Sequence, residues 1–155
     1  MSSSPVLALV GTAAGGVELI RTTLVQPLID EGWTVGVTLT PAAAVWLADS
    51  GELQALEKLT GLPVRSAPRL PREPRPHPDP DCCAVVPATA NTVAKLALGL
   101  ADNQALTQTC EAIGFGTPVV VFPRINAAHV RQPAWKGHIE ALSSVGVRLI
   151  YGDDV

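Results

Sequence analysis

Five apolar runs of strand length recur along the chain. They cover residues 5–10 (PVLALV), 33–39 (WTVGVTL), 82–87 (CCAVVP), 118–122 (PVVVF) and 147–151 (VRLIY). None of them alternates strictly between apolar and polar positions, which is typical of parallel strands that are covered on both faces. The runs therefore predict five buried strands in a mainly parallel sheet.

Segments with helical periodicity separate these runs. Residues 15–32 carry apolar side chains at close to a 3.6-residue period and end at Gly32, where a helix C-terminus commonly has a glycine. Within this segment, Pro27 predicts a kink or a join between two helical pieces. The other predicted helices cover residues 42–51, 91–103, 104–114 and 133–146. Strands that alternate with helices of this length predict βαβ units and a three-layer α/β sandwich.

Residues 65–81 interrupt the alternation. From Pro68 to Pro80 a proline stands at almost every second or third position, which excludes a helix or a central strand. We expect an extended, polyproline II-like excursion on the surface, with its arginines and His77 solvated. A segment that binds a partner is the alternative interpretation.

Composition narrows the class of protein. The chain has 155 residues, 47% of them hydrophobic and 16% charged, so we expect one domain over residues 1–155 with a well-supplied core. The net charge is −3 and no block of lysine and arginine stands out, so neither nucleic acid nor an anionic membrane is an expected partner.

The N-terminal segment and the cysteines favour a cytoplasmic location. The run VLALV (6–10) is too short for a membrane span and has no basic segment before it, unlike a signal peptide. The three cysteines, Cys82, Cys83 and Cys110, are an odd number with two of them adjacent, which disfavours a disulfide framework. No histidine or cysteine partners stand at ligand spacing, so no metal site is expected.

Right-handed crossovers bring the carboxyl ends of all the strands to one edge of the sheet, where such folds bind ligands. After the first strand, GTAAGG (11–16) is a glycine-rich turn that leads into a helix, whose free N–H groups can hold a phosphate. It is not a GxGxxG motif, and no acidic residue ends the second strand. Dinucleotide binding is therefore disfavoured.

Two further junctions reach the same edge. Thr40 precedes Pro41 and can act either as a helix N-cap or as a hydroxyl that contacts a phosphate. The third strand runs directly into Thr89, Asn91 and Thr92. Together the three junctions predict a site for a small phosphorylated cofactor with a polar, ring-shaped head.

The segment PATANTVAKLALGLADN (87–103) resembles the PASANT-type motif of the homo-oligomeric flavin-containing cysteine decarboxylases. This family includes phosphopantothenoylcysteine decarboxylase and the peptidyl-cysteine decarboxylases of lantibiotic biosynthesis. Residues 11–47 resemble the opening flavin-binding segment of the family. Residues 122–152 resemble its P-x-M-N-x-x-M substrate motif and the helix and strand that follow.

This resemblance implies an FMN-binding, flavodoxin-like (Rossmann-like) fold in a trimer or a dodecamer of trimers, with FMN at the subunit interface. It implies that the flavin oxidises a C-terminal peptidyl cysteine or a small thiol acid to a thioaldehyde, which loses CO2 to give an enethiol. The cofactor-binding positions that it implies are Gly11, Thr12, Ala13, Thr40, Thr89, Ala90, Asn91, Thr92 and Asp102.

The active-site histidine of the family falls on a different residue type here. It stands fourteen residues before the proline of the PASANT-type motif, and this position is Glu73, counted back from Pro87. His77 is the nearby candidate, four residues out of register, and would need the proline-rich loop to fold back.

The substrate motif is partly kept. It reads Pro123, Arg124, Ile125, Asn126 and, two residues later, His129, so the asparagine is present and both methionine positions differ. Pro123, Arg124 and Asn126 are the predicted substrate-binding residues, and Arg124 can pair with an anionic substrate or with a neighbouring subunit. We expect Asn126 with His129 or His77 to handle protons. A helix-start histidine bonded to backbone or solvent is the alternative for His129.

Family members continue beyond the point where IYGDDV ends this sequence, into a lid that in the phosphopantothenoylcysteine enzymes carries a reducing cysteine. From this difference we expect release of the enethiol and reoxidation of the flavin by another acceptor such as oxygen, and coenzyme A synthesis is disfavoured. Two other interpretations stay open: a non-catalytic FMN carrier or regulatory subunit, and a flavin prenyltransferase.

Overall fold

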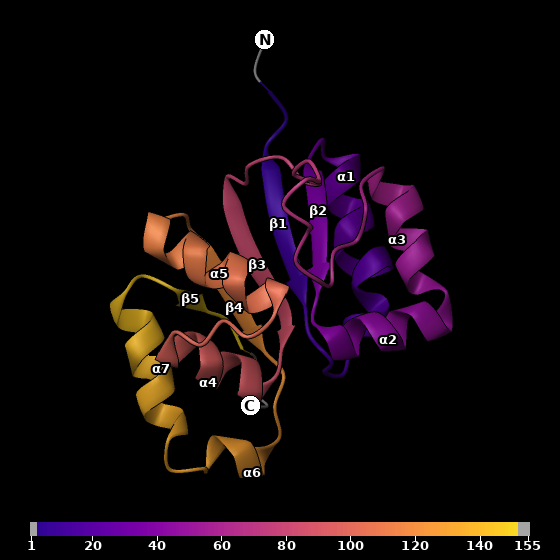
Figure 1. The fold of residues 1–155 in the computed structure, drawn as a ribbon. Helices are drawn as coiled ribbons and strands as arrows, with labels where there is room; N and C mark the ends of the chain where they lie inside the picture. The colour runs from indigo at the N-terminus through magenta and orange to yellow at the C-terminus, as the bar shows by residue number, and fades with distance from the viewer. Residues whose placement is uncertain (1–2, 152–155) are drawn as a thin grey trace.

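The computed structural model describes residues 3–151. Its centre is a five-stranded sheet with the order β2-β1-β3-β4-β5, in which every pair of neighbours is parallel (Figure 1). The strands are β1 (Val6–Gly11), β2 (Thr34–Leu39), β3 (Cys82–Ala88), β4 (Val119–Pro123) and β5 (Arg148–Leu149). All five predicted strands are present, which confirms the predicted parallel α/β architecture.

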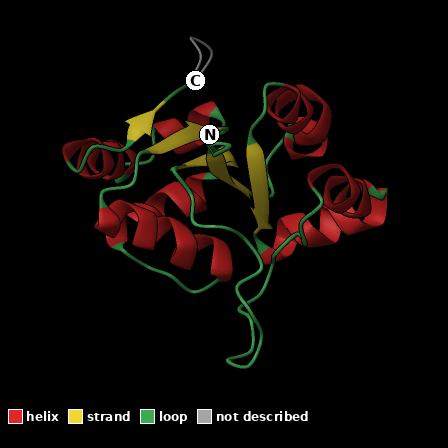
Figure 2. Ribbon diagram, turned by 90° about the horizontal axis from the view of Figure 1, so that it is seen from above, coloured by secondary structure: helices red, strands yellow, loops and turns green. Residues whose placement is uncertain are grey.

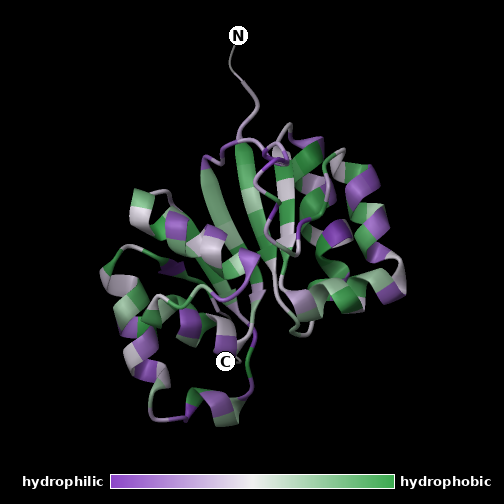
Figure 3. Ribbon diagram, in the orientation of Figure 1, coloured by the Kyte–Doolittle hydropathy of each residue, from purple (hydrophilic) through white to green (hydrophobic). Residues whose placement is uncertain are grey.

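Helices cover both faces of the sheet (Figure 2). The helical segments are η1 (Val17–Leu19), η2 (Arg21–Val25), α1 (Gln26–Asp30), α2 (Pro41–Ser50), α3 (Glu52–Thr60), α4 (Ala90–Leu98), α5 (Gln104–Phe115), α6 (Ala127–Val130) and α7 (Trp135–Ser144). On β1, Leu7 and Leu9 pack with η1, η2, α2 and α3, whereas Ala8 and Val10 pack with α4, α5 and α7. Because successive strand residues face opposite sides, two covered faces require apolar residues at every position. The central strands are accordingly apolar along their length (Figure 3).

The first helical segment confirms the predicted join at Pro27. A short 3-10 turn and a π-helical turn precede α1, and Pro27 lies in the first turn of α1, where its missing N–H group costs no helical hydrogen bond. Helix α3 was not predicted. It begins after Gly51 and ends at Gly61, both with positive φ, and the ion pair between Arg21 and Glu52 (2.7 Å) fixes its start to η2.

The predicted helix over residues 91–103 is wrong at its C-terminal end. Helix α4 stops at Leu98 because Gly99 takes a left-handed conformation (φ 72°), and residues 99–103 form a loop. The side chain of Asn103 then accepts a hydrogen bond from Leu106 N (2.8 Å) and so caps α5. The predicted helix over residues 133–146 corresponds to α7, and the short α6 precedes it.

The proline-rich loop contains neither helix nor strand, as predicted, apart from an isolated bridge between Arg65 and Thr38. In Figure 1 the loop crosses in front of β2. The prediction that His77 is solvated is wrong. Its ring is half-buried, lies against Gly36 in the middle of β2 and is hydrogen-bonded through Nε2 to the carbonyl of Pro63 (2.6 Å). Gly36 makes this contact possible, because a Cβ there would stand 2.8 Å from Nδ1 of His77.

Candidate functional site

The carboxyl ends of β1 to β4 meet at one edge of the sheet, and direct hydrogen bonds join the loops that follow them. The backbone N–H of Thr40, after β2, donates to the carbonyl of Gly11 at the end of β1 (3.0 Å). The backbone N–H of Arg124, after β4, donates to the carbonyl of Ala88 at the end of β3 (2.8 Å). Four strand–helix junctions therefore form one continuous structure, which we call the carboxyl edge.

Thr12 holds the β1 and β3 junctions together. Its hydroxyl donates to the carbonyl of Pro87 (2.8 Å) and accepts from the backbone N–H of Thr89 (3.0 Å), while its own N–H also donates to Pro87 (3.2 Å). The side chain is buried, with 1% of the residue exposed. Thr12 therefore fixes the spacing of the β1 and β3 junctions. A ligand would contact the groups that Thr12 holds in place.

Thr40 and Thr89 are the N-caps of α2 and α4. The Thr40 hydroxyl accepts from Ala43 N (3.3 Å), and the Thr89 hydroxyl accepts from Thr92 N (3.1 Å) and donates to the Thr92 hydroxyl (2.9 Å). Of the two roles considered for Thr40, the structure therefore shows capping. Both caps place the N-terminus of a helix, with its partial positive charge, at the carboxyl edge.

Several backbone N–H groups at the carboxyl edge have no acceptor within the described part of the chain. They belong to Ala13 and Gly15 in the glycine-rich turn, Ala42 in the first turn of α2, and Ala90 and Asn91 in the first turn of α4. The Arg124 side chain lies beside the turn, since its Nε would be 4.0 Å from a Cβ at Gly15. Free amides and two helix N-termini are donors that bind a phosphate, and a guanidinium binds a phosphate or a carboxylate.

A family model described as Flavoprotein matches residues 2–154, which is nearly the whole chain. The chain belongs to the Flavoprotein family. Among the curated relatives in this family, the coenzyme A biosynthesis bifunctional protein CoaBC of Escherichia coli (strain K12) is 31% identical over 148 residues. That match covers 91% of this chain but 34% of the relative, so the chain spans about a third of the length of that protein.

Solved structures support the same flavodoxin-like fold. TvaF, an FMN-dependent cysteine decarboxylase from thioviridamide biosynthesis, superposes with a TM-score of 0.76 at 25% identity, covering 94% of this chain and 89% of that one. SpaF, another FMN-dependent cysteine decarboxylase, superposes with a TM-score of 0.75 at 23% identity, covering 97% and 85%. The described residues of this Flavoprotein family member fit the phosphate end of FMN, because free backbone N–H groups and two helix N-termini lie together at the carboxyl edge.

The substrate-motif residues follow β4 at the same edge. Pro123 ends β4 and pairs with Ala88, and the Asn126 side chain accepts from the backbone N–H of His129 (3.0 Å), capping α6. Asn126 and His129 are both exposed. The cap uses the amide oxygen of Asn126 and leaves its NH2 group available. Among residues 3–151, no hydrogen bond to the His129 ring is described.

Two predicted site residues lie apart from the carboxyl edge. His77 rests on Gly36, four residues before Thr40, which corresponds to about 13 Å along a strand. The contact with Gly36 and the hydrogen bond to the carbonyl of Pro63 hold His77 against β2, so the loop does not deliver His77 to the junctions. Asp102 lies in the loop after α4, where its carboxylate pairs with Lys95 (2.6 Å), and this pair lowers the pKa of Asp102.

Cysteine chemistry from the chain itself is disfavoured. All three cysteines are free, and burial raises the pKa of the Cys83 thiol to about 12. Burial also raises the pKa of Cys82 and Cys110. Within residues 3–151 no group of three or more histidine, cysteine or acidic residues is placed to hold a metal ion. Over the same residues, no helix has the length and apolar character needed to cross a membrane.

Sequence reasoning predicted free N–H groups at the carboxyl edge but did not say which residues would provide them. The glycine-rich turn and a possible cap at Thr40 were predicted, but the cap at Thr89 and the position of Arg124 beside Gly15 were not. The sequence does carry a signal for the position of Arg124. Arg124 directly follows Pro123 at the end of β4, and β4 neighbours β3 in the sheet. The role of Thr12 was also predicted differently, as a direct cofactor contact.

Proposed function

We propose that this chain binds FMN at the carboxyl edge and oxidatively decarboxylates a C-terminal peptidyl cysteine or a small thiol acid to an enethiol. The observation that carries the proposal is the set of unpaired amides of the glycine-rich turn, α2 and α4 beside Arg124. The likeness to TvaF over 94% of the chain supports the same chemistry.

FMN, when bound, supplies a two-electron oxidant for the thiol carbon. The amides of Ala13, Ala42 and Ala90 hold the phosphate, and Arg124 binds the substrate carboxylate until CO2 leaves. His129 removes the thiol proton and, once CO2 has left and the electron pair has moved onto sulfur, returns the proton to the sulfur of the enethiolate, with the Asn126 amide orienting the substrate. Electrons, CO2 and protons are then all accounted for in the conversion of a thiol acid to an enethiol.

The test is anaerobic addition of short peptides that end in cysteine to the FMN-loaded protein. The proposal expects the flavin absorbance near its visible maxima to bleach and the peptide to lose the mass of CO2 and two hydrogens. Peptides that end in serine are the matched control, since they lack the thiol. A flavin that stays oxidised with every thiol peptide would contradict the catalytic proposal while leaving FMN binding intact.

His129→Asn tests the assignment of the base. This variant should retain FMN and lose turnover by about two orders of magnitude or more, the usual contribution of a general base. His138→Asn is the control, because His138 lies on α7, outside the substrate motif. Unchanged turnover in His129→Asn would return the proton transfer to another group.

A non-catalytic FMN carrier or regulatory subunit is the second candidate. It is favoured by Glu73, which occupies the position of the family histidine and whose carboxylate accepts a hydrogen bond from Leu70 N (2.8 Å) within the loop. His77 does not replace that histidine at the carboxyl edge. Flavin that binds but never bleaches would select this candidate.

We also propose that the working form is a homo-oligomer, a trimer or a dodecamer of trimers, in the cytoplasm. Leu19 on η1 and Val45 and Trp46 on α2 are 53%, 68% and 51% exposed, next to the carboxyl edge. The three free thiols favour a reducing compartment. Sedimentation should give an oligomer that Trp46→Glu dissociates, and a wild-type monomer would contradict this part of the proposal.

A further inference from the structure

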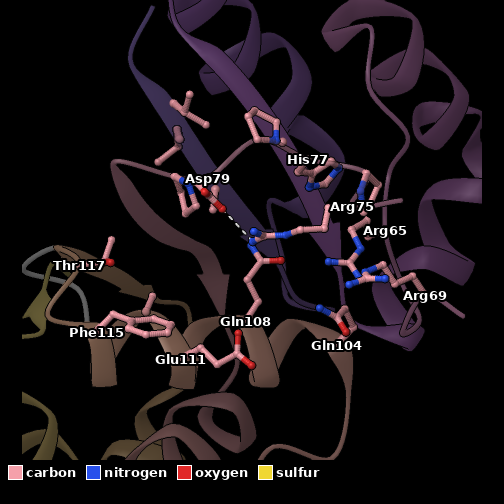
Figure 4. A pocket seen from close by; sticks show the side chains of 18 residues that line it. Arg65, Arg69, Arg75, His77, Asp79, Gln104, Gln108, Glu111, Phe115 and Thr117 are labelled. Carbon is pink, nitrogen blue, oxygen red and sulfur yellow. Dashed lines mark ion pairs between the residues drawn. The ribbon is translucent and has the colours of Figure 1, made fainter. Parts of the chain in front are cut away.

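A cavity lies away from the carboxyl edge, between the proline-rich loop and α5. Its volume is about 450 Å³, within the range of small-molecule sites. The floor is the amino half of β1 with Gly36 of β2, one wall is the loop from Arg65 to Pro80, and the other wall is the outer side of α5. Figure 4 shows the polar side chains that point into it.

Arginines concentrate at one end of this cavity. Figure 4 shows Arg65 and Arg69 near Gln104, while Glu111 and Phe115 lie at the other end. Arg65 is half-buried, and within the described residues no carboxylate stands within 4.0 Å of its guanidinium. Arg69 donates to the backbone carbonyl of Glu73 (2.8 Å), which leaves its charge uncompensated as well.

The third arginine of the cavity differs from these two. Arg75 pairs with Asp79 (2.8 Å), so its charge is balanced within the loop. Burial, followed by the neighbouring charges of Arg69 and Arg75, lowers the pKa of Arg65, which indicates that the guanidiniums repel one another. An anion between Arg65 and Arg69 would relieve this repulsion and form charge-assisted hydrogen bonds with both.

The rest of the cavity suits an apolar body. Ala8 presents a floor with little side-chain relief beside the His77 ring, which covers Gly36, and Pro76 and Pro78 form an apolar part of the loop wall. Phe115 stands at the rim and is 84% exposed, so its ring is free to pack against a ligand. A flat apolar group of a ligand could cover both the floor and this ring.

We propose that this cavity binds a small organic anion, with its phosphate or carboxylate held by Arg65 and Arg69 and its apolar part over Ala8, beside His77, toward Phe115. The site is independent of the proposed flavin site. Gly36 lies four residues before Thr40, which corresponds to about 13 Å along β2.

The test uses the full chain saturated with FMN, and phenyl phosphate and benzoate as probes. Amide NMR signals separate the two sites: the Gly36 amide and the side-chain amides of Gln104 and Gln108 report on the cavity, and the amides of Ala13 and Ala90 report on the carboxyl edge. The proposal expects saturable shifts at the cavity signals. Shifts confined to the edge signals, or none at all, would overturn it whether or not FMN binds.

Charge variants locate the anion. Arg65→Gln and Arg69→Gln should each weaken binding about tenfold, as expected for the loss of a hydrogen bond to a charged group. Arg72→Gln is the matched control, because Arg72 lies in the same loop and does not line the cavity. Glu111→Gln should tighten binding by removing a carboxylate from the cavity. An equal loss of affinity in Arg72→Gln would mean that the overall charge of the loop, and not contact with Arg65 and Arg69, causes the effect. That result would overturn the proposal.

A second copy of the chain is the competing occupant. Sedimentation of the same variants distinguishes it from a small ligand. Arg65→Gln and Arg69→Gln should leave the oligomer size unchanged if the cavity serves a small anion. A reduced oligomer size, together with no probe binding to the wild-type protein, would identify the cavity as an interface between copies and overturn the proposal.

Discussion

The carboxyl edge and the proline-rich loop are built in opposite ways. At the edge, each strand runs into a cap and then a helix within a few residues, and hydrogen bonds such as Thr12 to Pro87 and Thr40 to Gly11 join neighbouring junctions. The loop has no regular structure, and its seat on the sheet depends on His77 against Gly36, 41 positions earlier in the sequence. The edge is therefore built from local helix caps and from hydrogen bonds between neighbouring junctions, whereas the loop is held by long-range contacts with β2, made by His77 and by Arg65.

This contrast separates two kinds of ligand site. The edge presents backbone amides, whose directions are fixed by helices and strands, and such groups suit a cofactor that must be held rigidly. The cavity under the loop presents arginine side chains, which depend on their own rotamers and on the loop. Changes at the edge should therefore affect stability and flavin binding together, whereas changes in the loop should affect stability or the cavity and leave flavin binding unchanged.

Thr12→Val should have the largest effect. Valine keeps the shape but removes both hydrogen bonds of a buried hydroxyl, which costs about 1–3 kcal/mol of unfolding free energy. Because the β1 and β3 junctions lose their spacing, FMN affinity should fall as well. Urea unfolding and FMN titration measure the two effects. Thr107→Val is the control, since the Thr107 hydroxyl makes a long exposed contact of 3.5 Å; an equal response in both variants would contradict the role given to Thr12.

Gly36→Ala should have the next largest effect. The added Cβ would stand 2.8 Å from Nδ1 of His77 and displace the loop, at a cost of about 1–2 kcal/mol in unfolding free energy. FMN affinity should be unchanged. Gly114→Ala is the control, because nothing lies within 4 Å of that Cβ, and it should stabilise α5 by about 0.5–1 kcal/mol. A loss of FMN binding in Gly36→Ala would show that the loop and the edge are not independent.

The smallest expected effect is a pH dependence from His77. Burial lowers its pKa, outweighing the hydrogen bond to Pro63, which raises the pKa, and Arg65 lowers it further. Below the ordinary value of about 6.5 the unfolded chain binds a proton that the folded chain does not, so the unfolding free energy falls as the pH drops through this value. His77→Gln should remove this part of the slope between unfolding free energy and pH. An unchanged slope would mean that the ring is not seated on the sheet.

Sequence reasoning succeeded where structure is local. The strands, the cap at Thr40 and the join at Pro27 follow from the residues beside them. Helix α3 was missed although Leu53, Leu56 and Leu59 recur at a helical spacing between two helix-ending glycines; its start is held by Arg21, far away in the sequence. The position of His77 could not be predicted, because it depends on the gap left by Gly36 on another strand.

The candidate site shows the same division. The sequence identified which junctions meet, since parallel strands share one carboxyl edge. It assigned the threonine hydroxyls to the ligand, whereas the structure uses those of Thr12, Thr40 and Thr89 to hold the junctions together. Whether a hydroxyl is free depends on the distances between strands, which the sequence alone does not specify.

The most direct test of the account is an FMN titration, followed by visible absorbance, of the wild-type protein and of Asn91→Asp. Asn91 is exposed in the first turn of α4, where an aspartate suits the helix, so the variant should fold at least as well as the wild type. The negative charge of the new carboxylate would repel the phosphate or the flavin. The account predicts that wild type binds FMN and that Asn91→Asp binds about tenfold more weakly or not at all. Equal, normal flavin occupancy in the two proteins would contradict the placement of the flavin at the carboxyl edge.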